Sequence, residues 1–186
     1  MDLGRLHSRV ERRGAVGALW PAEEPEDPDP RPWLAELVAA GRFPADEGCW
    51  LGDTLEALAP QALAPAAWCF THGDINAGNV MVAGAPPRYR ALLDWAGSGW
   101  SDPAWDFAGV SLSVARPILA GHRAIAPLSA NATAESRIFW RHTQLALFSM
   151  RRSPDWPPER LGEAARRLVR GARAFLEPGD SADAML

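Results

Sequence analysis

Asp74, Asn79 and Asp94 are oxygen-bearing side chains that lie within a short part of the chain. Asp74 stands five residues before Asn79, and Asp94 follows after two short apolar runs. Phosphoryl transfer needs a carboxylate beside the attacking hydroxyl and oxygen ligands for the Mg²⁺ ion that bridges the phosphates. Asp and Asn supply such oxygens, so the types and order of these residues indicate phosphoryl-transfer chemistry.

The catalytic loop of protein kinases has the same order of residues. There a catalytic Asp precedes a metal-binding Asn by about five residues, and a second metal-binding Asp comes later in the chain. An Asp and an Asn at this spacing would by themselves occur by chance in many soluble proteins. Stronger support comes from short motifs that follow one another within about 35 residues, at positions 72–74, 78–79, 93–95 and 102–106.

Residues 72–79 read His-Gly-Asp-Ile-Asn-Ala-Gly-Asn. This segment closely resembles the H-G-D-[LI]-[HN]-x-G-N loop of the aminoglycoside phosphotransferase and choline kinase-like family. Leu-Asp-Trp at 93–95 and Asp-Pro-Ala-Trp-Asp at 102–106 are similar to two further motifs of that family. Three departures leave the catalytic groups intact: Asn76 stands where His is most frequent, Ser101 where Gly is common, and Ala96 where some members carry a carboxylate.

The resemblance implies a role for each polar residue of these motifs. Asp74 would act as the catalytic base or orient the acceptor hydroxyl, and Asn79 and Asp94 would bind Mg²⁺. Asp106 would accept hydrogen bonds from the backbone of the catalytic loop, where a charged acceptor forms stronger bonds than a neutral one. His72 would shape the loop. ATP would be the cosubstrate, and the acceptor would be a small hydroxylated molecule, for example a cationic aminoglycoside or choline-like amine.

Short apolar runs predict the elements that position these residues. Residues 68–71 suit a buried strand that leads into the catalytic loop. Residues 80–83 and 89–93 flank a Gly/Pro-rich turn and predict a hairpin. That hairpin would bring Asn79 near Asp94.

The other segments predict a mainly helical chain with two solvated loops. Pro- and carboxylate-rich residues 21–32 and Gly/Ser-rich residues 96–101 are the predicted loops. Helices are predicted in the first dozen residues, from Pro32 to a stop at Gly41, from Thr54 to Ala59 after an Asp53–Glu56 capping box, and at about 103–115, 134–151 and 157–176.

A nucleotide-binding lobe is absent from this pattern. All 19 basic residues are Arg, so no Lys is present to hold the ATP phosphates, and Arg is not a conservative substitute. No strand-rich segment with a glycine-rich loop precedes His72, and residues 1–8 resemble the helix that opens the family's C-terminal lobe. Three explanations remain open: a truncated reading frame, one half of a split enzyme, or a decayed protein.

The predicted fold is therefore α+β and mainly helical. Residues 1–186 would form one C-terminal lobe of the protein kinase-like fold, with a small catalytic hairpin and a catalytic and metal-binding core at 72–108. A lobe without its partner should expose apolar surface, which predicts contact with a missing N-terminal lobe or self-association.

Three functions compete. The first is an ATP- and Mg²⁺-dependent phosphotransferase, and the second is a non-catalytic binding or regulatory lobe that lacks the ATP lobe. The third is a metal-dependent hydrolase with His72, Asp74 and Asp94 as ligands, which would leave Asn79 and Asp106 as coincidences. The upstream nucleotide sequence would separate the first two.

The charge and the apolar pattern of the sequence argue against nucleic acid and membranes as partners. A net charge of −4 and a pI near 5.6 argue against nucleic acid, and no apolar run is long enough to span a membrane, so a cytoplasmic location is expected. Cys49 and Cys69 are interpreted as buried free thiols. His7, His122 and His142 stand apart from any second donor in the sequence and are interpreted as surface or core histidines.

Overall fold

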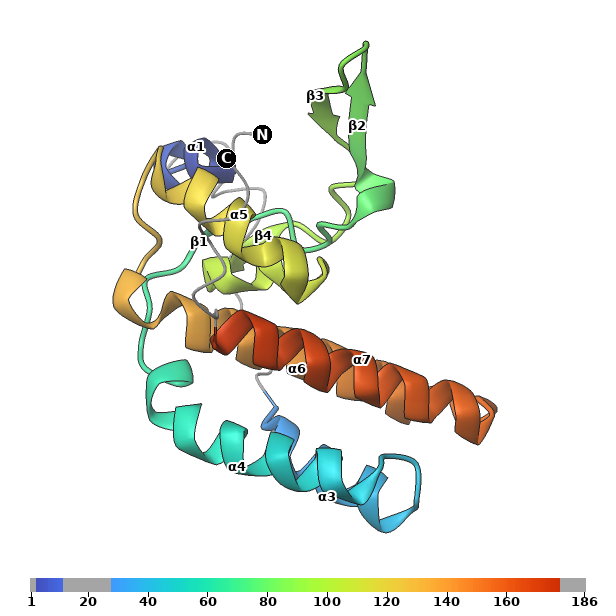
Figure 1. Cartoon of the computed structure of the whole chain (residues 1–186). Helices are drawn as coiled ribbons and strands as arrows, with labels where there is room; N and C mark the ends of the chain where they lie inside the picture. The colour runs from blue at the N-terminus through green and yellow to red at the C-terminus, as the bar shows by residue number, and fades with distance from the viewer. Residues whose placement is uncertain (1–2, 12–27, 178–186) are drawn as a thin grey trace.

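The computed structural model describes residues 3–11 and 28–177. Helices α6 and α7 lie side by side across the middle of the molecule, α3 and α4 pack on one side of them, and α1, α5 and four short strands lie on the other (Figure 1). The fold is α+β and mainly helical, as predicted. The α-helices are α1 (Leu3–Arg9), α3 (Pro30–Ala39), α4 (Ala45–Ala62), α5 (Leu112–Arg123), α6 (Ala134–Arg151) and α7 (Pro158–Leu176).

Two small antiparallel sheets flank the catalytic loop. Strand β1 (Cys69–Thr71) pairs with β4 (Gly99–Ser101), and β2 (Val80–Ala83) pairs with β3 (Arg88–Leu92). The buried strand before His72 and the hairpin were both predicted. Strand β4 lies in the predicted Gly/Ser loop; Trp100 faces Phe70 edge-on across the pair, with ring centroids 5.6 Å apart, and this contact makes a strand there favourable.

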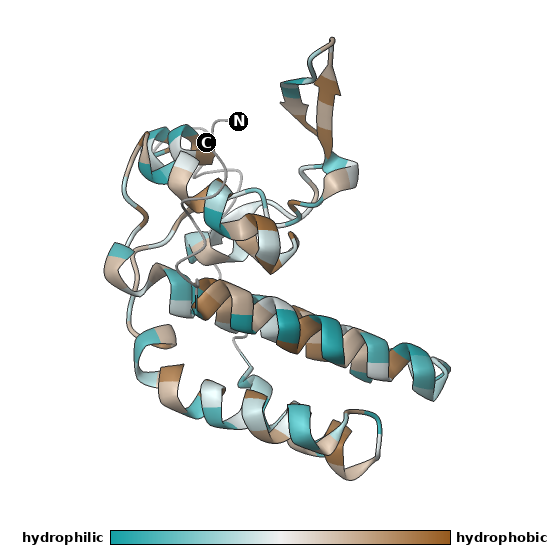
Figure 2. Ribbon diagram, viewed as in Figure 1, coloured by the Kyte–Doolittle hydropathy of each residue, from teal (hydrophilic) through white to brown (hydrophobic). Residues whose placement is uncertain are grey.

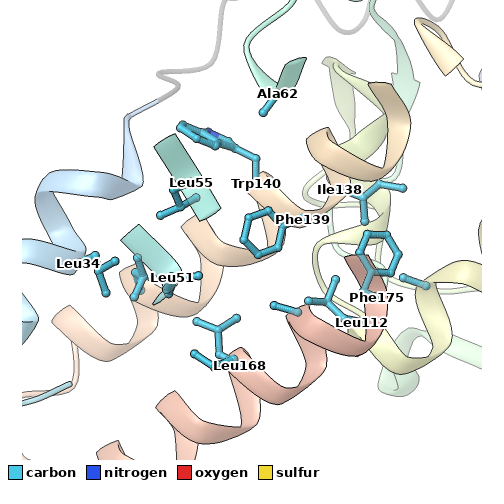
Figure 3. Close-up of a cluster of buried hydrophobic side chains, with 14 of the residues drawn as sticks. Leu34, Leu51, Leu55, Ala62, Leu112, Ile138, Phe139, Trp140, Leu168 and Phe175 are labelled. Carbon is cyan, nitrogen blue, oxygen red and sulfur yellow. The ribbon is translucent and has the colours of Figure 1, made fainter. Parts of the chain in front are cut away.

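The hydrophobic core lies among the long helices (Figure 3). Leu51 and Leu55 of α4 and Phe139 and Trp140 of α6 have at most a trace of exposed surface. Each contributes about 1.5–3 kcal/mol relative to an exposed side chain. Helix α7 follows the expected helical period, with one face buried at Leu161, Ala165, Leu168, Val169, Ala172 and Phe175. The predicted helices 134–151 and 157–176 match α6 and α7.

The predicted capping box at Asp53 and Glu56 is wrong. Helix α4 begins at Ala45, directly after Pro44, and both residues lie exposed within it. The apolar stripe of Leu51 and Leu55 extends back to the buried Gly48, and two acidic residues in the first turn favour the earlier start.

The predicted helix at about 103–115 is two elements. A 3₁₀ helix, η2 (Pro103–Phe107), is separated from α5 by residues 108–111. At Gly109 a Cβ atom would lie 2.4 Å from the carbonyl oxygen of Ile75, so the chain here passes against the catalytic loop. Ser111 then caps α5 by accepting a hydrogen bond from Ser113 N.

Three other expectations concerned the loop at 21–32, the two cysteines and membrane-spanning helices. Of the predicted loop 21–32, residues 21–27 lie outside the described residues, and Pro30, Arg31 and Pro32 form the first turn of α3 with Asp29 as its cap. Cys49 is exposed, so only Cys69 is a buried thiol. No helix in the described ranges is long and apolar enough to cross a membrane.

Candidate active site

The catalytic loop begins where β1 ends. Thr71 closes the strand with two hydrogen bonds to β4, from its Oγ1 to Gly99 O at 3.0 Å and with Ser101 Oγ at 2.8 Å. Gly73 follows with a φ angle of 82°, and a Cβ atom there would lie 1.9 Å from Gly97 O. Glycine is therefore required at position 73 both by the backbone conformation and by the close approach of a second loop.

Asp74 lies exposed on this loop, and two amide side chains hold its carboxylate. Asn76 Nδ2 donates to Asp74 Oδ1 at 3.0 Å, and Asn79 Nδ2 donates to Asp74 Oδ2 at 2.9 Å. Asn76 Oδ1 in turn accepts from Gly78 N at 2.8 Å and caps the 3₁₀ helix η1 (Ala77–Asn79). The five-residue spacing seen in the sequence is thus one turn that brings Asn79 back to Asp74.

The hairpin connects Asn79 to Asp94. Leu93 N donates to Asn79 O at 2.9 Å, so the residue before Asp94 is bound to the end of η1. Asp94 has a φ angle of 59°, a left-handed conformation that costs a residue with a Cβ atom about 1–2 kcal/mol. Backbone strain of this kind is concentrated at functional sites. The structure thus bonds Asn79 to Asp74 through its side chain and to the residue before Asp94 through its backbone.

His72 is fully buried at the start of the catalytic loop. Its Nε2 lies 2.9 Å from Leu93 O, its Nδ1 accepts from Asp74 N at 3.3 Å, and its ring lies 4.5 Å from that of Trp95. A carbonyl oxygen only accepts, so Nε2 carries the hydrogen and Nδ1 does not. Both ring nitrogens are used within the protein. These contacts connect the loop to Leu93 and oppose the hydrolase hypothesis, which needed His72 as a metal ligand. The loop-shaping role of His72 stays a prediction.

Asp106 on η2 holds the backbone of the loop from below. Its Oδ2 accepts from His72 N at 2.9 Å and its Oδ1 accepts from Gly73 N at 2.7 Å. Its carboxylate is buried, with 1% of the residue exposed. These are the contacts that the family resemblance implied for this residue.

Asp102 has a separate role that sequence reasoning did not predict. Its Oδ1 accepts from Arg137 Nη1 of α6 at 2.6 Å and from Ala104 N at 2.9 Å. Arg137 also donates to Ser129 O. The first Asp of the Asp-Pro-x-x-Asp motif thus attaches η2 to the helical core, while the second attaches it to the catalytic loop.

His122 is a buried histidine, as interpreted, but in the fold His7 and His122 are not isolated. Their rings are joined by a 3.0 Å contact between His7 Nδ1 and His122 Nε2, across 115 residues of sequence, and His7 Nε2 lies 2.9 Å from Asp106 Oδ2. The one local signal was Leu-x-x-Leu-His at residues 3–7. His142 is a partly buried histidine whose Nδ1 contacts Ala108 O at 3.0 Å, and burial lowers its pKa.

Asn79 and Asp94 are chemically suited to Mg²⁺. Asn79 uses its amide nitrogen on Asp74, which leaves its Oδ1 as the available atom, and Asp94 is an exposed carboxylate. Mg²⁺ prefers oxygen ligands and binds proteins through one or two carboxylates together with substrate phosphates. Among the described residues no group of three or more His, Cys, Asp or Glu side chains could hold a metal alone. The donor set therefore fits a metal shared with a phosphate.

A cavity of about 770 Å³ lies behind the loop, between α1 and α5. Ile75, Val80, Val110, Val114 and Ile118 are among its lining residues, whereas Asp74, Asn79 and Asp94 are not. Asn76, whose Nδ2 holds the Asp74 carboxylate, also lines this mostly apolar space, so the cavity adjoins the catalytic loop.

Comparison with known proteins agrees with this geometry. No match was found among curated proteins or among solved structures. The family model described as the phosphotransferase enzyme family matches residues 2–161, which include α1, the catalytic loop, the hairpin and both support carboxylates. The chain belongs to the phosphotransferase enzyme family.

Proposed function

We propose that this chain is the catalytic lobe of an ATP- and Mg²⁺-dependent phosphotransferase that acts on the hydroxyl group of a small molecule. The observation that carries the proposal is the pair of hydrogen bonds from Asn76 and Asn79 to the exposed Asp74 carboxylate. They hold one carboxylate in a single orientation beside two oxygen donors suited to a metal. Such an arrangement meets the needs of phosphoryl transfer, in which positioning and electrostatics dominate.

Asp74 would orient the acceptor. Each of its carboxylate oxygens accepts one amide hydrogen bond and retains capacity for a second. A substrate hydroxyl could donate its hydrogen to that free capacity and direct its oxygen at the phosphorus atom. Asp74 would then accept the proton as the new bond from the acceptor oxygen to the γ-phosphorus forms and the bond from that phosphorus to the bridging oxygen breaks, so that ADP leaves.

Asn79 and Asp94 would hold Mg²⁺ against the phosphates of ATP. When bound, the ion would neutralise the negative charge that develops on the phosphate oxygens. The bond from Leu93 N to Asn79 O keeps the two ligands in register. His72 and Asp106 would contribute indirectly, by fixing the backbone that carries Asp74.

The protein kinase-like lobe also implies a contact for the hairpin. Met81, Val82 and Tyr89 expose 46%, 55% and 37% of their surfaces, and the apolar strand β2 projects from the molecule (Figure 2). We propose that this hairpin packs against the lobe that supplies the remaining nucleotide contacts, including the phosphate-binding cation that the Lys-free chain lacks. The acceptor is a small hydroxylated molecule.

A non-catalytic binding lobe is the second candidate, and the absence of Lys favours it. Mg-ATP binding separates the two. If the first proposal holds, Mg-ATP raises the melting temperature of the protein, because a ligand that binds only the folded state stabilises it. An unchanged melting temperature at millimolar Mg-ATP would favour the second candidate.

Transfer of ³²P from [γ-³²P]ATP to a panel of aminoglycosides, choline and simple alcohols tests the reaction. Asp74→Asn should lower the transfer rate by about 100-fold or more, the usual contribution of such a group. Asp53→Asn is the matched control, since Asp53 lies exposed on α4, far from the loop in the fold. Full activity in Asp74→Asn would remove Asp74 from the mechanism.

A further inference from the structure

A row of hydrogen bonds runs from α5 through α1 to the support beneath the catalytic loop. His122 Nε2 lies 3.0 Å from His7 Nδ1, and His7 Nε2 lies 2.9 Å from Asp106 Oδ2. All three side chains are buried: His122 is 3% exposed as a residue, and the side chains of His7 and Asp106 are 5% and 0% exposed. The polar atoms of these three side chains must therefore find their hydrogen-bond partners and countercharges within the protein, because water does not reach them.

The acceptors at the two ends determine how many hydrogens the rings carry. His122 Nδ1 lies 3.0 Å from Ala126 O, a carbonyl that only accepts, so Nδ1 must carry a hydrogen. The Asp106 carboxylate also only accepts, so His7 Nε2 must carry one. The contact between His7 Nδ1 and His122 Nε2 requires a third hydrogen, because one of these two nitrogens must donate to the other. Two neutral imidazoles carry one hydrogen each, so this pair holds one proton more than its neutral form.

The extra proton belongs on imidazole and not on Asp106. An ordinary Asp carboxyl group has a pKa of about 3.9 and an ordinary imidazole a pKa of about 6.5, so an imidazole holds its proton more tightly. The two backbone N–H groups of the loop further stabilise the Asp106 carboxylate. Burial lowers the pKa of His122, with a further contribution from the His7 charge, so His122 is the neutral ring that accepts from His7.

The other titratable groups nearest His7 cannot replace this charge. Cys69 on β1 is a buried thiol whose pKa is raised by burial, so it stays neutral. His72 on the catalytic loop uses one nitrogen as donor and the other as acceptor, so it is neutral as well.

The cations around the row are also engaged elsewhere. Arg123 of α5 forms an ion pair with Glu135 at 2.7 Å, and Arg137 of α6 is held by Asp102. Arg5 and Arg9, on the same helix as His7, are exposed to solvent. His7 Nε2, at 2.9 Å from Asp106 Oδ2, is positioned to supply the countercharge.

We propose that His7 and His122 are positioning residues that hold one shared proton, whose charge neutralises Asp106 and so fixes the backbone of the catalytic loop. His7 carries the charge, and His122 orients the His7 ring by accepting at its own Nε2 a hydrogen bond that His7 Nδ1 donates. Only the catalytic consequence rests on the proposed phosphotransferase function. The protonation of the ring pair is a property of the folded chain.

Loss of this proton changes the contacts in a defined way. If His7 were neutral, either its Nδ1 or its Nε2 would present a lone pair to an acceptor, and one bond of the row would be lost. In either case the buried Asp106 carboxylate loses its countercharge, and when the bond to Asp106 is the one lost it also loses the His7 donor. The loop amides of His72 and Gly73 would then be its remaining donors, and the loop would become less firmly held.

Long-range ¹H–¹⁵N NMR of the side chains of the four histidines measures this directly. At pH 7.5 we expect imidazolium nitrogen shifts for His7 and a neutral ring with a hydrogen on Nδ1 for His122. Asp106→Asn should turn His7 into a neutral ring. A neutral His7 in the wild-type spectrum overturns the proposal, and that spectrum suffices even if Asp106→Asn does not fold.

Glutamine substitutions separate charge from hydrogen bonding. His7→Gln keeps a donor toward Asp106 but removes the charge, so its melting temperature should fall by about 6 °C or more. The substitution should also accelerate hydrogen exchange at the backbone amides of His72 and Gly73, by a factor at least ten times larger than at the amides of α7. His122→Gln can still accept from His7 and should have the smaller effect, and His142→Gln is the control, at a partly buried histidine away from the row. Equal effects of His7→Gln and His142→Gln on the loop amides would overturn the proposal.

Activity gives a separate readout. His7→Gln should lower kcat for phosphoryl transfer, with KM for ATP little changed and with partial retention of kcat in His122→Gln. If the wild-type chain transfers no phosphate to any acceptor, the proposed function fails. The NMR protonation state then still decides the present proposal.

Discussion

The support side and the reactive side of the catalytic loop are built in opposite ways. Beneath the loop, Asp102 and Asp106 are buried and each accepts several short hydrogen bonds. Above it, Asp74 and Asp94 are exposed, and the hairpin beside them makes few contacts with the rest of the described chain. The same residue type thus serves two purposes. Burial makes a carboxylate a fixed structural acceptor, whereas exposure leaves it free for a substrate or a metal.

Breaking the support side should have the largest effect. Arg137→Met leaves the Asp102 carboxylate buried without its principal cation, which should lower the free energy of unfolding by about 3–5 kcal/mol. Arg123→Met is the matched control, because the Arg123–Glu135 pair is about one-third exposed and should contribute about 1 kcal/mol or less. Urea denaturation measures both. Equal losses would mean that burial does not distinguish these ion pairs.

Disturbing the close contact between Gly73 and Gly97 should have the next largest effect on stability. Gly73→Ala should lower the free energy of unfolding by more than the conformational cost of about 1–2 kcal/mol, because the new Cβ would overlap Gly97 O. Gly41→Ala isolates the conformational term, since Gly41 has a φ angle of 65° and no atom within 4 Å of a built Cβ. The difference between the two variants in thermal or urea unfolding measures the close approach. Identical losses would contradict it.

Lowering the pH should reduce the free energy of unfolding through His142. Burial lowers its pKa below that of the unfolded chain, so the unfolded state binds a proton that the folded state refuses. Stability from this group is complete above about pH 6.5 and falls as the pH drops below that value. His142→Gln retains a donor for Ala108 O and removes the titration. Its unfolding free energy should therefore decline less between pH 7.5 and 5.5 than that of the wild type.

The hairpin should show the smallest effect on stability. Met81→Ser with Val82→Thr should change the free energy of unfolding by about 0.5 kcal/mol or less, because both side chains are exposed. The same pair should reduce self-association, since it removes part of an exposed apolar patch. Light scattering over a range of concentrations tests this. Leu63→Ser is a control, as Leu63 is 50% exposed and lies at the C-terminal end of α4, not on the hairpin.

Local features of the site could be predicted from the sequence. Asp74, Asn79 and Asp94 are linked by one turn and one hairpin, and the two apolar runs around the Gly/Pro turn predicted the hairpin that connects Asn79 to Asp94. The helices α6 and α7 were predicted because their apolar period is long and uninterrupted. In both cases neighbours in sequence determine the structure.

Features that depend on distant residues were missed. Residues 108–111 are non-helical where they pass the carbonyl of Ile75, and β4 forms where Trp100 meets Phe70. The contact of His7 with His122 spans most of the chain, and nothing local marks either residue as its partner. The support side of the site was therefore much less predictable than its reactive side.

The two loop amides bonded to Asp106 have a consequence for exchange with solvent. The amide hydrogens of His72 and Gly73 end on a carboxylate that water does not reach, although Gly73 itself is an exposed residue. Their deuterium exchange should therefore require the opening of η2 and not a local fluctuation of the loop. A surface segment would then report the same opening free energy as the interior, and the catalytic loop would belong to the most slowly opening cooperative unit of the chain.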